Sequence, residues 1–156
     1  MRNFSERSFV DLSVNAFFQS EKATGLFEAS EWVNYRVKVS KILEDFHKWL
    51  SERSEDGMRI YGYGAAAKAS TILNSIDLEL GLITAIADAS LEKQNRFMPP
   101  HGIEIISPEK LFAGKPTDVV IFPWNIKSEI ASYLGANLGE GVRLWCAIPE
   151  IHQVIK

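Results

Sequence analysis

The segment Arg59–Lys68 limits the folds open to this chain, because it predicts a buried strand that ends in a glycine turn and opens a helix. Gly62, Gly64 and Ala67 have the spacing G-x-G-x-x-G/A of a dinucleotide-type phosphate loop. In such a loop the first glycine allows a tight turn and the second lets the backbone approach a phosphate. The third small residue lets the helix pack closely on the strand. A strand, a turn and a helix in this order are typical of an α/β fold.

In this turn, unpaired backbone N–H groups and the positive end of a helix would be available to bind an anion. Its candidate phosphate-binding residues are Gly62, Tyr63, Gly64, Ala65, Ala66, Ala67 and Lys68. Lys68 supports the hypothesis, since a cation in the first helical turn opposes the helix dipole and a bound anion would compensate it. Two alternatives stay open: a glycine turn that only turns the corner of a sheet, and a solvent-exposed lysine on an ordinary helix.

The rest of the chain alternates strands with helices. The spacing of apolar residues predicts a long helix from Ser30 to about Ser54, with Ser30 as its N-cap. Strands are predicted at 58–63, 82–87, 103–106 (short and edge-like), 118–122 and 142–148, and helices at 65–76, from 107 and at 127–138. Strands this uniformly apolar are buried on both faces. We expect a Rossmann-like, open and mostly parallel sheet flanked by helices and preceded by the long helix.

We expect two parts: an N-terminal arm or linker over residues 1–27, with one helical turn or two, and the Rossmann-like domain with its leading helix over residues 28–156. The formal net charge of −3, without a basic block, argues against nucleic acid and anionic membranes as partners. No apolar run approaches the roughly 18 residues that span a bilayer. The single cysteine, Cys146, predicts a buried thiol in a reducing cytoplasm.

Ligands of open parallel sheets bind beyond the carboxyl ends of the strands. Asp88 ends the second predicted strand, 21 positions after Ala67 (88 − 67), where an acid could accept a hydrogen bond from a ribose. It could equally be a plain turn residue. Lys93 and Arg96 follow in a polar loop and could hold a phosphate or diphosphate, Arg96 through its bidentate fork. The alternative is an ordinary solvated loop.

Trp124 and Asn125 follow another buried strand and complete the set of candidate binding residues. The tryptophan can offer its face to a flat ring, and the asparagine offers a donor and an acceptor. The alternative is a tryptophan that covers the rim of the core. We predict no metal site, because the loop histidines His101 and His152 have no cysteine, histidine or acid at ligand spacing and His47 lies on the polar side of the long helix.

Familiar catalytic patterns are missing from the sequence. It has no Tyr-x-x-x-Lys pair, no Gly-x-Ser-x-Gly elbow and no cysteine paired with a histidine. A nucleotide-cofactor enzyme would also carry a second half or a substrate domain, and the sequence ends at Lys156. We therefore expect a binding module whose chemistry lies elsewhere.

Four motifs carry a resemblance to a known family: Gly-Tyr-Gly-Ala-Ala-Ala-Lys at 62–68, Lys-Gln-Asn-Arg-Phe at 93–97, Pro-Trp-Asn at 123–125 and Ile-Pro-Glu at 148–150. Over nearly its whole length the chain resembles the C-terminal domain of S-adenosylmethionine-dependent sugar C-methyltransferases. These enzymes methylate a carbon of nucleotide-linked deoxysugars. The resemblance implies an enzyme of three parts, with a zinc-binding N-terminal domain and a central methyltransferase domain before this one.

The resemblance implies that this chain binds a nucleotide-diphosphate sugar through the glycine turn with Lys68, the Lys93 and Arg96 loop, and Trp124 with Asn125. It would work with the missing methyltransferase domain, in cis or in trans, hold neither S-adenosylmethionine nor zinc, and be inactive alone. Two other classes remain open. One is an NAD(P)-binding half-domain of an oxidoreductase, which the turn and Asp88 permit. The other is a structural or interaction domain whose phosphate loop stays empty.

Overall fold

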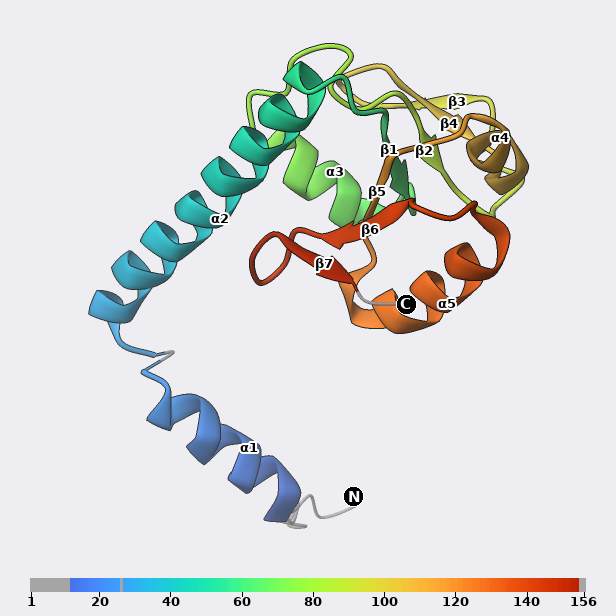
Figure 1. Cartoon of the computed structure of the whole chain (residues 1–156). Coiled ribbons are helices and arrows are strands. Elements are labelled where there is room, and N and C mark those ends of the chain that lie inside the picture. Colours follow the sequence, from blue (N-terminus) through green and yellow to red (C-terminus); the bar gives the residue numbers. More distant parts are fainter. Residues whose placement is uncertain (1–11, 26, 155–156) are drawn as a thin grey trace, which may run out of the picture. The chain divides into compact units, whose positions relative to one another are not determined.

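The computed structural model describes residues 12–25 and 27–154 (Figure 1). Of the predicted N-terminal arm, residues 1–11 and 26 lie outside the described residues. The structure divides into two compact units, one ending at Val39 and the other beginning at Ser40. The boundary that we predict after residue 27 stays a prediction, and the division into units falls inside a continuous helix.

Two helices come first in the chain, α1 (Leu12–Ala23) and α2 (Ala29–Glu55). The 27 residues of α2 confirm the predicted long helix. It begins one residue early, so Ser30 lies in its first turn and is not the N-cap. The 12 residues of α1 form about three turns, more than predicted for the arm. Among the described residues, no helix is both long and apolar enough to cross a membrane.

A seven-stranded sheet forms the centre of the second unit, in the order β3-β4-β2-β1-β5-β6-β7 (Figure 1). The strands are β1 (Ile60–Tyr63), β2 (Ile86–Ala87), β3 (Arg96–Met98), β4 (Ile103–Ile106), β5 (Asp118–Ile121), β6 (Arg143–Cys146) and β7 (His152–Val154). The five inner strands are mutually parallel, whereas β3 and β7 pair antiparallel at the two edges. The predicted open, mostly parallel sheet is confirmed.

Helices cover both faces of the sheet. The later part of α2 and α3 (Ala67–Asn74) pack on one face, where Phe46, Leu50 and Leu73 meet the apolar side chains of the strands. The other face is covered by α4 (Pro108–Ala113) and α5 (Lys127–Asn137), the latter preceded by the 3-10 turn η1 (Trp124–Ile126). The inner strand order β4-β2-β1-β5-β6 with helices on both faces is the Rossmann-like arrangement.

The two edge strands were not predicted. Residues 96–98 were expected in a polar loop, but they pair outside β4, so the strand at 103–106 is internal and its edge-like assignment is wrong. Residues 152–154 similarly pair outside β6. A strand of three residues is too short for a readable alternation of apolar and polar positions. Both strands exist because a neighbouring strand offers them backbone hydrogen bonds.

Candidate functional site

The loops that follow β1 and β5 form the candidate site. These two strands are neighbours at the centre of the sheet, with Tyr63 in register with Ile121. The chain leaves β1 for α3 on one face and leaves β5 for α5 on the other. Such a point, where the strand order reverses, opens a crevice beyond the carboxyl ends of the strands, and ligands of this fold class bind there.

Gly62, in β1, and Gly64, in the turn, each have a packing reason for lacking a side chain. A Cβ on Gly62 would lie 2.7 Å from Phe122 Cε2 and 2.8 Å from Ile86 Cγ1. Gly64 has a φ of +92°, and a Cβ there would lie 2.5 Å from both Cγ and Cδ of Pro123. The space that a phosphate loop leaves for its ligand is therefore bordered here by the loop after β5.

The first turn of α3 carries a helix terminus without a side-chain cap. Ala66 occupies the N-cap position in an extended conformation, and its side chain accepts no hydrogen bond. α3 begins at Ala67, two residues later than predicted. Ala65, just before α3, and Ala69, within it, are both buried. Their small side chains allow α3 to lie close to the strands. The N–H groups of this first turn keep their capacity to bind an acceptor.

Three predicted residues come together at this turn. Lys68 Nζ donates a hydrogen bond to Oδ1 of Asn125, 57 positions later in the chain. The same ammonium lies 4.5 Å from the centre of the Trp124 ring, which is within the range of a cation–π interaction. Lys68 is half-buried, whereas Asn125 is exposed. The structure thus places a cation, an aromatic face and an amide in one cluster, which we call the switch-point cluster.

Asp88 lies directly beside the glycine turn, since the Gly64 N–H donates to the carbonyl of Ala87 at 2.7 Å. It is 8% exposed, and both of its carboxylate oxygens have partners in the following loop. Oδ1 accepts from the Ser90 N–H at 2.9 Å, and Oδ2 pairs with Lys93 Nζ at 3.0 Å. A ribose would have to share this carboxylate with the lysine, which weakens the argument for an NAD(P)-type contact.

Arg96 is not part of the switch-point cluster. It begins β3, is exposed, and its Cα is in register with Ile105 of β4. Three strand spacings separate β3 from β1, a distance of about 14 Å across the sheet. Among the described residues Arg96 has no ion pair. Only a ligand that extends along the carboxyl edge could contact both Arg96 and Lys68.

Tyr63 is among the predicted phosphate-binding residues, but the sequence analysis did not predict the surroundings of its side chain. It lies on the α4 and α5 face, with its ring 6.2 Å from that of Tyr133. Burial raises the pKa of the Tyr63 phenol, and the neighbouring Tyr133, Asp88 and Glu109 raise it further. The alternation of side chains along a strand could have found it, because Tyr61 and Tyr63 point to the face opposite Gly62.

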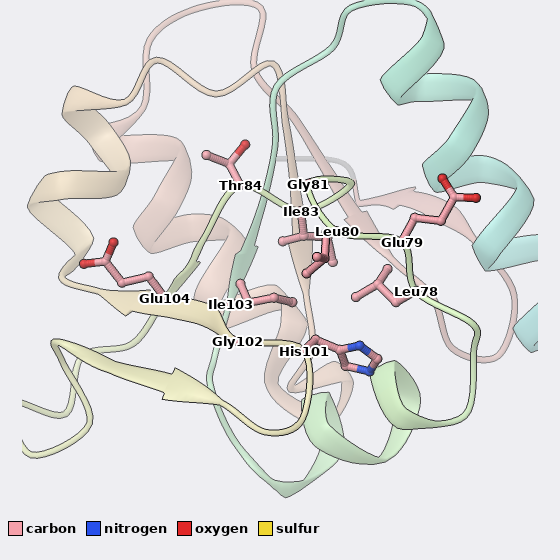
Figure 2. Close-up of a pocket in the computed structure, with 10 residues that line it drawn as sticks. All are labelled: Leu78, Glu79, Leu80, Gly81, Ile83, Thr84, His101, Gly102, Ile103 and Glu104. Carbon is pink, nitrogen blue, oxygen red and sulfur yellow. The ribbon is translucent and has the colours of Figure 1, made fainter.

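A cavity of about 410 Å³ lies at the other end of the sheet (Figure 2). Its wall combines the segment before β2, including Leu78 and Ile83, with the turn before β4, including His101. His101 Nε2 is 3.0 Å from the Leu73 carbonyl, which fixes the ring at the rim. The cavity is thus formed near the amino ends of β2 and β4, away from the switch-point cluster. The described residues contain no group of three His, Cys, Asp or Glu that could hold a metal ion.

The strand order, the helices on both faces and the glycine turn define a Rossmann-like α/β domain. The sequence profile of the family described as the C-methyltransferase C-terminal domain matches residues 2–149, so the chain belongs to that family. This confirms the resemblance drawn from the sequence motifs.

The individual proteins similar to the chain include a curated relative and a solved structure. C-methyltransferase NovU of Streptomyces niveus is 25% identical over 138 residues, which are 88% of this chain and 33% of that protein. The chain therefore spans about a third of the length of this relative. The crystal structure of UDP-D-quinovosamine 4-dehydrogenase from Vibrio fischeri superposes with a TM-score of 0.45 and 18% sequence identity. The match covers 63% of this chain and 93% of the other.

Proposed function

We propose that this chain is the nucleotide-sugar-binding domain of an S-adenosylmethionine-dependent sugar C-methyltransferase. The switch-point cluster is the observation that carries the proposal, because it gathers Lys68, Trp124 and Asn125 beside an uncapped helix terminus. Family membership supports methyl transfer as the reaction of the larger protein. Methyl transfer itself would take place on another domain, which would also hold S-adenosylmethionine and zinc.

The residues of the cluster have distinct roles in this proposal. A diphosphate would bind the first-turn N–H groups of α3, with Lys68 neutralising part of its charge. Asn125 holds the Lys68 ammonium in place through a hydrogen bond before the ligand arrives, and the face of the Trp124 ring contacts the same ammonium. A nucleotide base or sugar ring could then pack against the part of the Trp124 ring that Lys68 leaves uncovered. Lys93 would contribute only by leaving Asp88.

Isothermal titration calorimetry of this chain with dTDP and dTDP-linked deoxysugars tests the proposal. We expect Lys68→Ala to weaken binding by about 1–3 kcal/mol, or about 5–150-fold, which is typical of a charge-assisted contact. Lys48→Ala is the matched control, since Lys48 is an exposed lysine on α2 that pairs with Glu52. Binding that is lost in both variants would show a general charge effect instead of a site.

The rival oxidoreductase function is separated by a fluorescence titration with NADH. We expect no NADH binding, because the Asp88 carboxylate is already bonded to Ser90 and Lys93. NADH binding that depends on Asp88, without binding of dTDP-sugars, would replace the proposal with an NAD(P)-binding half-domain. Absence of heat with every dTDP ligand, both for this chain and for its complex with a methyltransferase domain, would contradict the proposal outright.

A further inference from the structure

The first unit exposes an unusual amount of apolar surface. Its exposed large apolar side chains are Val14, Phe17, Phe18, Phe27, Trp32, Val33, Tyr35 and Val37. Among the described residues 13–25 and 27–39, none is buried. Contiguous apolar patches beyond a few hundred Å² mark interaction surfaces in soluble proteins. This unit therefore has no core of its own among these residues, and its apolar side chains need a partner.

Helix α1 shows the same requirement. Val14, Phe17 and Phe18 follow the spacing i, i+3, i+4 and so share one face of the helix. Helices of 12 residues are marginal in water unless an apolar face packs against something. The ring of Phe18 reaches Phe27, with the centroids 5.5 Å apart, which extends this apolar face to the turn between the helices.

A hollow on α2 gives this surface its specificity. It has a volume of about 390 Å³ and is lined by Thr24, Glu31, Trp32, Tyr35 and Lys38. The Trp32 and Tyr35 rings meet edge to face at 6.2 Å. Glu31 and Lys38 are seven positions apart, two turns along the same side of the helix, so about 10 Å separates the acid from the base. The aromatic rings lie between two opposite charges.

We propose that a second copy of this chain docks on this surface, with the two α2 helices antiparallel. A two-fold rotation about a point near Tyr35 brings Glu31 of each copy to Lys38 of the other, with Tyr35 at the centre and Trp32 beside it. The surface is thus complementary to itself, which a symmetric dimer requires. Because Glu31 and Lys38 carry opposite charges, this surface lacks the uniformly basic character that binds anionic membranes.

The exposed aromatic side chains supply more than half of the area that a stable dimer buries. The five aromatic side chains are about half exposed or more, and each would bury 150–250 Å² in full, so together they offer roughly 500 Å² per copy. Val14 and the charged rim add to this area, whereas Val33 and Val37, each two positions from Tyr35, lie on the other side of α2. A stable interface buries about 800 Å² per partner. This proposal concerns the first unit alone and does not rest on the nucleotide-sugar function.

Sedimentation velocity of the full chain over a wide range of concentration tests the dimer. We expect a species of twice the 17.5 kDa chain mass, which Trp32→Glu converts to monomer. Leu91→Glu is the matched control, because Leu91 is 82% exposed but lies in the second unit. A chain that stays monomeric at every concentration overturns the proposal. So does a dimer that survives Trp32→Glu, since it would use another surface.

A charge exchange tests the antiparallel arrangement. Glu31→Lys alone and Lys38→Glu alone each place like charges across both contacts, and we expect the dimer dissociation constant to rise about tenfold for each. An equal mixture of the two variants restores both opposite-charge contacts, so it should dimerise as tightly as the parent chain. A folding defect in either variant could not produce that recovery. A mixture that stays as weak as its components overturns the antiparallel pairing.

Discussion

Replacing Gly64 by alanine probes the centre of the candidate site. Gly64 has a φ of +92°, in the region that side chains disfavour, and an added Cβ would lie 2.5 Å from two ring carbons of Pro123. The proline ring is bonded to its own backbone nitrogen, so it cannot rotate away as a flexible side chain would. The variant must therefore shift the loop after β5, which carries Trp124 and Asn125.

The loss of stability expected for Gly64→Ala has two parts. The left-handed backbone costs an alanine about 1–2 kcal/mol, and overpacking a filled site costs about 1–3 kcal/mol. We expect Gly64→Ala to lower the free energy of unfolding by their sum, about 2–5 kcal/mol. Gly57 is the matched control, because its φ is +74° and an added Cβ meets nothing within 4 Å. Gly57→Ala should lose only the backbone part, about 1–2 kcal/mol.

Urea denaturation, followed by tryptophan fluorescence, measures both variants. Pro123→Ala removes the two ring carbons, so the Gly64→Ala, Pro123→Ala double variant should recover the overpacking part of the loss. Equal losses for Gly64→Ala and Gly57→Ala would refute the argument that Pro123 requires a glycine. Gly64 would then be free for the close approach of a ligand, and its replacement should weaken ligand binding without an extra loss of stability.

Two further predictions concern buried groups. Asp118 is fully buried and accepts from Arg143 at 2.9 Å, so Asp118→Ala should cost about 3–5 kcal/mol in urea denaturation, whereas Asp45→Ala, which breaks an exposed pair with Lys41, should cost at most about 1 kcal/mol. Comparable losses would contradict this difference. The pKa of the Tyr63 phenol is raised in the folded state, so the folded chain holds this proton more tightly than the unfolded chain. The contribution of Tyr63 to the free energy of unfolding is therefore complete below pH about 10 and is lost as pH rises through the folded pKa. Tyr63→Phe should make the alkaline fall in stability less steep, and an unchanged slope would contradict it.

The fold could be read largely from local patterns. The long helix, the strands β1, β5 and β6 and the helix α5 follow from runs of apolar residues with helical or continuous spacing. The cap of α4 was also readable, and the Lys110 N–H indeed donates to Ser107 Oγ at 3.3 Å. The edge strands were not readable, because three-residue strands depend on the neighbour that pairs with them. The strand β2 is likewise shorter than its apolar run.

The candidate site was predicted as separate pieces. Lys68, Trp124 and Asn125 were each identified from their place after a strand, and the structure shows the contacts among them. Arg96 was grouped with the same ligand, yet strand order places it at the edge of the sheet. The binding roles of all these residues remain predictions.

The sequence by itself determined the class of fold, the family and the residues at the carboxyl ends of the strands. These follow from interactions between positions close in the chain, such as helical spacing, glycine turns and short motifs. Only the tertiary structure decided what the glycines face and which cations are already paired. Pro123 borders Gly64, Asn125 holds Lys68 and Asp88 holds Lys93. Strand order brings most of these partners together across long stretches of chain, and no local pattern records that order.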